Sequence, residues 1–156
     1  PDQEACQSDL TRSADELGIN GISPALFAEA FASRMSIAGM GRIGIIGSVA
    51  GDRGRKSNYI YGAAKGLLTR YAQGLQHRFA GTEIVVTLIK PGPTQTPMTA
   101  HLSENGPKMA DVTTVAQDIV DGMARKRQVI YTPGKWLAIM MIIRHLPRII
   151  FNWMDI

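Results

Sequence analysis

The sequence predicts an α/β fold built around a parallel sheet. Apolar runs at 43–46, 83–89 and 129–132 have the composition of strands. The segments between them show helical periodicity and are long enough to cross over from one parallel strand to the next. The run at 83–89 is apolar on both alternating faces, so we expect it to be a central strand covered on both sides. About three parallel strands with flanking helices are therefore expected.

The predicted helices lie before, between and after the strands. The first begins at Ser13, because Ser13 and Glu16 have the spacing of a capping box, and its apolar periodicity continues to Met35. A second helix covers about 59–79, and a third covers about 113–125. This order places one helix in each connection between consecutive strands.

Composition indicates one folded domain. Of the 156 residues, 45% are hydrophobic and 19% are charged, which excludes a disordered or fibrous chain. The single cysteine, Cys6, excludes an internal disulfide and agrees with a cytoplasmic location. No CxxC or HExxH motif supports a metal site. The net charge of +4 includes a basic cluster at 125–127, which we interpret as a solvated helix end and not as a nucleic-acid site.

Gly39, Gly41 and Gly44 spell G-x-G-x-x-G. This pattern marks a dinucleotide site when a strand precedes it and a helix begins within it. Here the predicted order is reversed, with a helix before the glycines and a strand after them. We therefore interpret the motif as a chance match.

The segment 47–66 carries the chemical signal of the chain. Tyr61 and Lys65 are four residues apart on the predicted helix, so their side chains share one face. Ser48 follows the first strand at its carboxyl end, where ligands bind in open α/β sheets. Tyr59 has no lysine four residues further on and points to another side of the helix. Packing or the lining of a substrate loop is therefore its expected role.

The chain carries Ser48, Tyr61, Lys65 and a later Pro91-Gly92 step. In their order and spacing these residues resemble the motifs of the short-chain dehydrogenase/reductase family. The resemblance covers residues 13–134 and implies a partial Rossmann-like parallel sheet, the carboxyl-terminal half of the family's domain. It also implies an oxidoreductase that uses NAD or NADP to reduce a carbonyl, or to oxidise an alcohol, by hydride transfer. Within the family, 47–66 is most similar to reductases of keto-sugars, including decaprenylphosphoryl-2-keto-erythropentose, which implies a sugar or sugar-lipid substrate.

The chemistry of these residue types fits that activity. The alkoxide that develops during carbonyl reduction needs a proton from a group within hydrogen-bond reach. A tyrosine with a pKa of about 10 is a poor base for the reverse direction, so we expect the cation of Lys65 to lower the pKa of Tyr61. Ser48 is suited to orient the substrate carbonyl. By the resemblance, Tyr61 and Lys65 also contact the cofactor, Lys65 through a ribose hydroxyl.

Asn20 lies where the family carries a catalytic asparagine whose carbonyl holds a water. Pro24 has no N–H to bond that carbonyl within a helix, which favours the same role here. An ordinary cap at Asn20, with Gly21 and Pro24 ending or starting a helix, explains the same residues equally well. Both interpretations stay open.

Residues 91–96, Pro-Gly-Pro-Thr-Gln-Thr, match the family's segment that contacts the nicotinamide carboxamide. By that resemblance Pro91 and Gly92 belong to the cofactor site. Thr94 is expected to contact the cofactor through its backbone, and Thr96 through its hydroxyl. A proline-rich turn explains the prolines but not the threonines, so the cofactor interpretation is preferred.

Residues 135–156 differ in kind from residues 1–134, which we assign to a Rossmann-type domain. The apolar run after residue 135 is too short to span a bilayer, and aromatic residues alternate with basic ones as in an interfacial amphipathic helix. Packing against a partner subunit or over the substrate pocket gives the same pattern and is preferred to peripheral membrane contact. A homo-oligomer is expected from the resemblance.

The residues before Ser13 contain no strand, glycine-rich turn and helix that would bind a pyrophosphate. The resemblance therefore implies that the chain is the carboxyl-terminal portion of an enzyme, left by truncation, proteolysis or gene fragmentation, and inactive alone. The alternative is a noncatalytic remnant that serves as an oligomerisation or interaction module.

Overall fold

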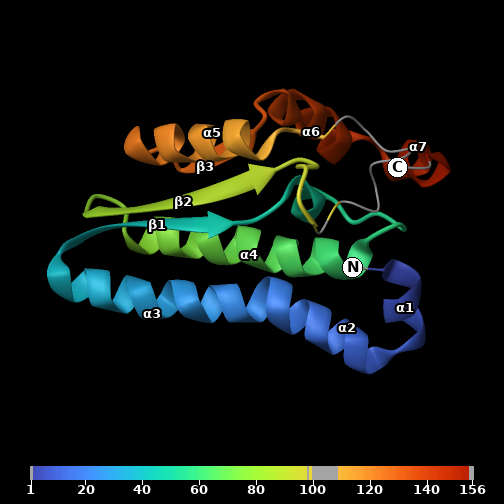
Figure 1. Ribbon diagram of the computed structural model, residues 1–156, viewed down its shortest axis with the longest axis horizontal. Coiled ribbons are helices and arrows are strands. Elements are labelled where there is room, and N and C mark those ends of the chain that lie inside the picture. The colour runs from blue at the N-terminus through green and yellow to red at the C-terminus, as the bar shows by residue number, and fades with distance from the viewer. Residues whose placement is uncertain (1, 98, 100–108, 155–156) are drawn as a thin grey trace.

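A computed structural model describes residues 2–97, 99 and 109–154 of the protein, and Figure 1 shows the arrangement of its helices and strands. In chain order the elements are α1 (Gln3–Ser8), α2 (Leu10–Leu17), the π-helix η1 (Gly18–Ile22), α3 (Ser23–Ala38), β1 (Met40–Ile46), the 3-10 helix η2 (Val49–Asp52), α4 (Tyr59–Arg78), β2 (Glu83–Pro91), α5 (Val112–Ala124), β3 (Val129–Thr132), α6 (Lys135–His145) and α7 (Arg148–Trp153).

The three strands form one parallel sheet in the order β1-β2-β3. Ile46 at the end of β1 lies opposite Ile89, and Pro91 at the end of β2 lies opposite Thr132. Helix α4 connects β1 to β2, and α5 connects β2 to β3. The predicted α/β class and the three-strand parallel sheet are confirmed. The carboxyl ends of all three strands consequently meet at one edge of the sheet.

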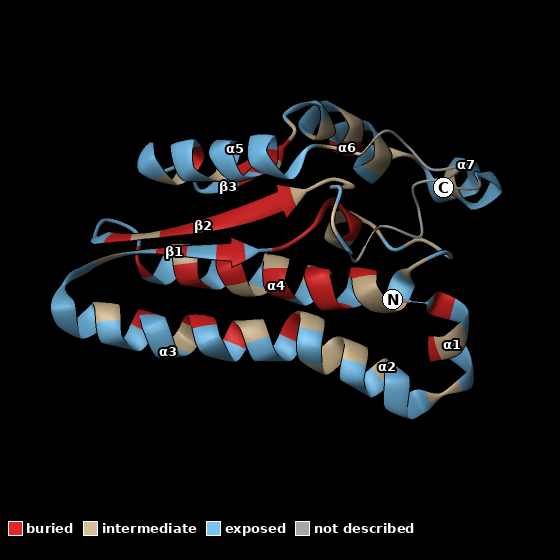
Figure 2. Ribbon diagram, in the orientation of Figure 1, coloured by how far each residue is buried: buried red, intermediate tan, exposed pale blue. Residues whose placement is uncertain are grey.

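Helices cover both faces of this sheet. Figure 1 shows α3 and α4 on one side and α5 and α6 on the other. Figure 2 shows β2 buried along most of its length, as its apolar character on both faces predicts. Among the described residues, no helix is both long enough and apolar enough to cross a bilayer.

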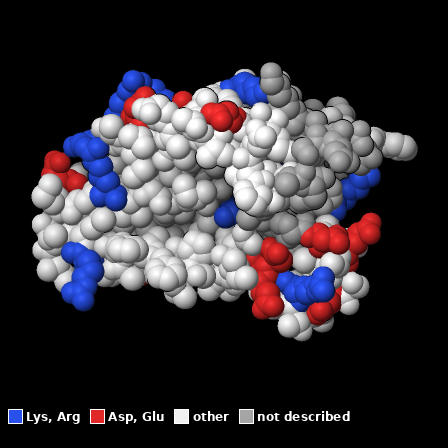
Figure 3. Space-filling model, viewed as in Figure 1, with Lys and Arg blue, Asp and Glu red and all other residues white. Residues whose placement is uncertain are grey.

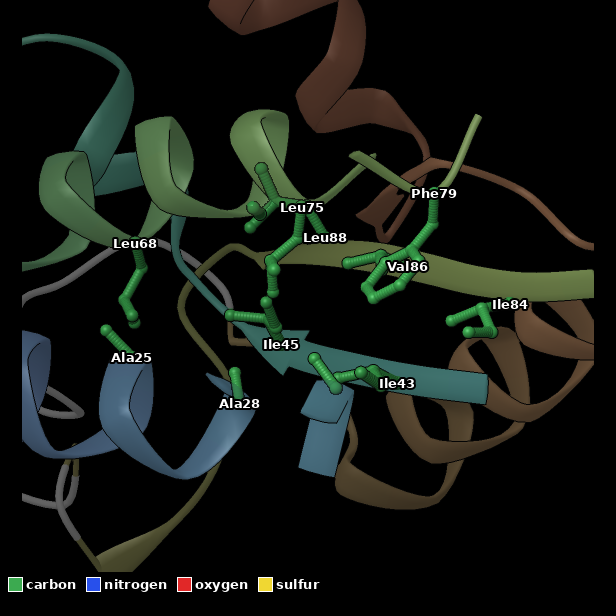
Figure 4. Close-up of a cluster of buried hydrophobic side chains, with 12 residues drawn as sticks. Ala25, Ala28, Ile43, Ile45, Leu68, Leu75, Phe79, Ile84, Val86 and Leu88 are labelled. Carbon is green, nitrogen blue, oxygen red and sulfur yellow. The ribbon is translucent and has the colours of Figure 1, made fainter. Parts of the chain in front are cut away.

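The main core lies between the sheet and the α3–α4 layer, as Figure 4 shows. Three alanines of α3 let this helix approach α4 and β1 closely, and larger side chains of α4 and the strands fill the remaining space. The buried cluster comprises Ala25, Ala28, Ala32, Ile43, Ile45, Leu68, Ala72, Leu75, Phe79, Ile84, Val86 and Leu88. This packing fixes α4 against the sheet, and α4 carries Tyr61 and Lys65.

The amino-terminal helices begin earlier than predicted. The carboxylates of Asp2 and Asp9 accept backbone N–H groups at the starts of α1 and α2. Ser13 lies inside α2, where its hydroxyl donates to the carbonyl of Cys6 at 2.6 Å. The capping box predicted at Ser13 is therefore wrong, because Asp9 already supplies the acceptor four residues earlier.

The glycines of the G-x-G-x-x-G match lie at a helix end and in a strand. Gly39 ends α3 with a φ of 75°, the left-handed conformation that favours glycine. Gly41 and Gly44 lie within β1. The helix therefore precedes the glycines and the strand follows them, which is the reverse of a pyrophosphate-binding turn.

Candidate active site

Ser48 lies just beyond the carboxyl end of β1. The N–H of Gly47 donates to the carbonyl of Ile89 at 2.7 Å, which continues the contact with β2 past the last strand residue. Ser48 itself is extended and buried, and its hydroxyl accepts the N–H of Ala50 at 3.1 Å, capping η2. The serine hydroxyl is thus held where the strand becomes a helical turn.

Two glycines bring η2 into backbone contact with α4. A Cβ on Gly51 would lie 2.6 Å from the carbonyl carbon of Lys65, and a Cβ on Gly62 would lie 3.1 Å from the carbonyl oxygen of Ala50. Any side chain at Gly51 would therefore push η2 away from the helix. The absence of a side chain at both positions places Ser48 beside the first turn of α4.

Tyr61 shares a side-chain hydrogen bond with Ser48. Burial raises the pKa of Tyr61 above its ordinary value, the bond to Ser48 opposes that shift, and the charge of Glu16 adds to it. Tyr59, in contrast, is 42% exposed. The structure therefore joins Tyr61, and not Tyr59, to the predicted serine.

Lys65 is buried one turn after Tyr61. Its ammonium donates to the carbonyl of Ile46 at 3.2 Å and lies 5.6 Å from the centroid of the Tyr61 ring. Burial lowers the pKa of Lys65. The expectation that Lys65 lowers the pKa of Tyr61 is wrong for this structure, because the loss of solvation on burial dominates the shift of the tyrosine.

Asn20 lies within the π-helix η1, between α2 and α3. Its side-chain amide donates to the Glu16 carboxylate at 2.6 Å, and α3 begins three residues later with Pro24 in its first turn. Asn20 is therefore not a helix cap, since Ile22 holds that position. A Cβ on Gly21 would lie 3.1 Å from the carbonyl of Ala64, so this turn packs directly on α4.

The Pro91–Thr96 segment extends from the end of β2. Gly92 donates to the carbonyl of Thr132 at 3.0 Å, and a Cβ at Gly92 would overlap the ring of Trp136. The Thr94 hydroxyl donates to the Gly92 carbonyl at 3.0 Å, and the Thr96 hydroxyl lies 3.2 Å from that of Thr99. Both predicted threonines thus take part in the hydrogen bonds that shape their own loop.

Sequence reasoning missed a buried polar cluster between the two site segments. Asp52, the last residue of η2, forms an ion pair with Lys90 at the end of β2. The Tyr131 hydroxyl donates to the second oxygen of the Asp52 carboxylate at 2.7 Å. The signal that was available is Lys90 itself, because a lysine that ends an apolar central strand requires a buried partner.

A cavity of about 290 Å³ opens beside the Pro91–Thr96 segment. Its walls come from that segment, from the residues just before α5, from the turn after β3 and from α6, and the lining residues are Pro93, Met109, Ala110, Pro133, Lys135 and Trp136. Most of these side chains are apolar, and Lys135 is the charged member of the set. The cavity lies at the carboxyl edge of the sheet, where ligands bind in α/β folds.

The described residues fit one end of a nicotinamide cofactor. Lys65 has three ammonium protons, and the bond to Ile46 uses one of them, so donors remain for ribose hydroxyls. The threonine-rich loop lies at the neighbouring strand end. Among residues 2–97, 99 and 109–154, however, no strand leads through a glycine-rich turn into a helix that would bind the pyrophosphate.

Comparison with known proteins gives the family. The model of the short chain dehydrogenase family matches residues 2–107. An uncharacterized oxidoreductase of Streptomyces coelicolor is 33% identical over 118 residues, which cover 73% of this chain and 45% of the relative. An uncharacterized oxidoreductase of Mycobacterium tuberculosis is 26% identical over 153 residues, which cover 98% of this chain and 61% of the relative.

Solved structures agree with the fold. A short-chain dehydrogenase from Sphingobium yanoikuyae in complex with NADPH superposes with a TM-score of 0.68 at 25% identity, covering 83% of this chain and 55% of that one. The chain therefore spans about half the length of the relatives that it matches.

Proposed function

The chain belongs to the short-chain dehydrogenase family, and from that premise we propose that it carries the proton-transfer half of an NAD(P)-dependent oxidoreductase. The observation that supports this function best is the approach of Ser48, Tyr61 and Lys65 at the carboxyl end of β1. In this proposal the enzyme reduces a small carbonyl compound, or oxidises the corresponding alcohol. The neighbour solved with NADPH supports a nicotinamide cofactor.

Tyr61 donates the proton in the proposed reduction. Its raised pKa keeps the phenol protonated at neutral pH, so a proton is available for the carbonyl oxygen as negative charge develops there. Ser48 holds the carbonyl by a second hydrogen bond, from the position in which it now bonds to Tyr61. Lys65 supplies a positive charge one turn away and holds ribose hydroxyls. A bound nicotinamide supplies the hydride.

Asn20 is proposed as the far end of the proton path. The π-helical turn that contains it packs on α4 through Gly21 and Ala64. The carboxylate that its side chain contacts, Glu16, is close enough to influence the pKa of Tyr61. A water held near this turn would return a proton to the tyrosine after each reduction.

The cofactor residues are proposed from the loop after β2. Thr94 and Thr96 would bind the carboxamide, and Pro91 and Gly92 set where the loop leaves the sheet. A keto-sugar or sugar-lipid substrate rests on the resemblance of residues 47–66. The pocket beside Trp136 is the proposed place for the part of the substrate that does not react.

The experiment compares the 156-residue chain with the protein encoded by the whole reading frame of its gene. NADH and NADPH binding is measured by fluorescence, and reduction of keto-sugars and aliphatic ketones is followed by nicotinamide absorbance. Tyr61→Phe should lower turnover by about 10³-fold, within the range for general acid catalysis, and Tyr59→Phe should not. Equal losses in the two variants would refute the assignment of Tyr61.

The competing function is a noncatalytic interaction module. It predicts that neither protein binds either cofactor, even though circular dichroism and a cooperative melt show that both are folded. Binding without turnover by the short chain, together with turnover by the longer protein, supports the enzyme.

A homo-oligomer is proposed through α3 and the turn before it. This surface exposes six large apolar side chains: Ile19, Ile22, Leu26, Phe27, Phe31 and Ile37. An exposed apolar stripe of this length on a helix commonly packs against helices of a second subunit. Leu26→Glu, whose side chain is 66% exposed, should shift sedimentation toward the monomer without unfolding the chain.

A further inference from the structure

The outer side of α6 and α7 exposes a second apolar surface, here called the carboxyl-terminal face. Its large apolar side chains range from 38% to 88% exposed, with Trp153 the most exposed. They are Leu137, Met141, Ile142, Ile149, Ile150, Trp153 and Met154. Single exposed apolar residues need no explanation, but six on two consecutive helices, followed directly by Met154, form an apolar surface that indicates a partner.

Basic residues border this face. At about 100° per residue, Leu137, Met141 and Ile142 share one side of α6, and Lys135 and Arg144 fall at its two margins. Arg148 begins α7. All three basic side chains are exposed. Long basic side chains at the margins of an apolar stripe can keep their charges in water while their stems lie along an apolar phase.

Acidic residues are absent from the sequence around the face. Residues 122–154 contain no Asp or Glu, and Asp155 is the first acidic residue that follows. The same stretch holds the basic residues Arg125, Lys126, Arg127, Lys135, Arg144 and Arg148. Of these, Lys135, Arg144 and Arg148 lie on α6 and α7, whereas Lys126 pairs with Glu83 at the start of β2. Figure 3 shows acidic side chains gathered over α1 and α2 instead.

The face is held rigidly by its inner side. Met140 of α6 is fully buried, and the Arg53 guanidinium donates to the carbonyls of Ile143 at 2.6 Å and Leu146 at 2.7 Å. Arg53 also lies 3.8 Å from the centroid of the Phe151 ring in α7. Both helices are thus tied to the loop after η2, and their outward side chains are free of these contacts.

We propose that the carboxyl-terminal face docks on the surface of an anionic lipid bilayer. An apolar side bordered by basic residues is the composition of helices that lie in the membrane interface, with tryptophan at the headgroup level. Headgroups of negative charge complement Lys135 and Arg148, whereas Arg144 shares a hydrogen bond with Tyr131. A second copy of this chain complements them poorly, because a two-fold contact places each basic margin against another basic surface. Lipid docking is independent of the proposed oxidoreductase activity.

Flotation of the 156-residue chain with vesicles tests this inference. Binding is expected to phosphatidylcholine vesicles that contain phosphatidylglycerol, weakly to pure phosphatidylcholine, and less at high salt. Ile149→Ser with Trp153→Ser should weaken binding about tenfold or more, since both side chains would leave the acyl boundary. Lys135→Gln and Arg148→Gln should each cost about fivefold. Trp153 fluorescence should shift to the blue in a Trp136→Phe background.

Leu26→Ser with Phe27→Ser on α3 is the matched control, because these side chains are 66% and 64% exposed and lie on the other apolar surface. Vesicle binding should survive in this variant. Equal loss in both double variants would overturn the inference, as would the absence of flotation with anionic vesicles. A lipid-free dimer that Ile149→Ser with Trp153→Ser converts to a monomer would also overturn it, since a second copy would then cover the face.

Discussion

Asp52 and Lys90 form an ion pair whose side chains are 2% and 5% exposed. Asp52 ends the turn that follows Ser48, and Lys90 directly precedes Pro91 at the end of β2. The pair therefore joins the segment of the candidate serine to the segment proposed to bind the nicotinamide. Tyr131 of β3 donates to the same carboxylate, so three strand ends share one buried cluster.

Removal of one partner should destabilise the fold strongly. Asp52→Asn leaves the Lys90 ammonium buried without a counter-charge, and we expect the free energy of unfolding to fall by about 3–5 kcal/mol. Urea unfolding followed by circular dichroism measures this change. Asp52→Asn combined with Lys90→Met should lose less than Asp52→Asn alone, because no unpaired charge remains. A double variant with the summed loss of the two single variants would contradict the account.

Gly51 in η2 and Gly54 in the loop after it are predicted to respond in opposite ways to substitution by alanine. A Cβ at Gly51 would lie 2.6 Å from the backbone of Lys65, whereas a Cβ at Gly54 would have no atom within 4 Å. Gly51→Ala should therefore lower the free energy of unfolding by about 1–3 kcal/mol through overpacking. Gly54→Ala should change it little. Thermal melts of both variants check this, and equal stability of the two would show that η2 does not press on α4.

Tyr131 should make the protein sensitive to alkali. Burial, followed by the hydrogen bond to Asp52, raises its pKa to about 12, against an ordinary value of about 10 in the unfolded chain. The folded state thus holds this proton more tightly, so its contribution to stability is complete below pH 10 and is lost as the pH rises toward 12.

The measurement for Tyr131 is the melting temperature as a function of pH. Between pH 10 and 12 the wild-type protein should lose stability more steeply than Tyr131→Phe, because phenylalanine has no proton to lose. Tyr71, whose pKa is also raised to about 12, stays in both proteins and is not removed by the comparison. Parallel curves for the two proteins would show that Tyr131 does not titrate in this range.

The pH dependence of catalysis should follow Tyr61. Because burial raises its pKa, the phenol stays protonated through neutral pH, and proton donation during carbonyl reduction should not change between pH 7 and 9. Alcohol oxidation needs the phenolate, so its rate should climb with pH over the same interval. Initial rates in both directions, measured on the protein from the whole reading frame, test this. A reduction rate that falls between pH 7 and 9 would mean that the pKa of Tyr61 is lowered during catalysis.

Local sequence patterns predicted the parts of the site that lie on one element. The four-residue spacing of Tyr61 and Lys65 places their side chains on one face of the helix. Apolar residues at both odd and even positions of β2 predict a strand that is covered on both faces of the sheet. The position of Ser48 after β1 followed from the same kind of reasoning. These features depend on neighbours in the chain, which the sequence displays directly.

Contacts between distant elements were not predictable in the same way. The pairing of Asp52 with Lys90 depends on how η2 packs on α4 and on the register of β1 with β2. The direction of the Tyr61 pKa shift was mispredicted because burial, which a sequence does not state, is its largest cause. The spacing of Ser13 and Glu16 predicts a cap at Ser13, but Asp9 is the residue that caps α2.

The outer edge of β1 should make the isolated chain prone to aggregation. Within the described residues β1 pairs with β2 alone, so the backbone groups along its other edge have no strand beside them. A seven-residue strand with an open edge is a template for pairing with other chains. We expect the isolated protein to aggregate when it is concentrated. Purification should therefore succeed best at low temperature and low protein concentration. A lysine placed at Met40, which is 67% exposed in β1, should improve its solubility if strand pairing is the cause.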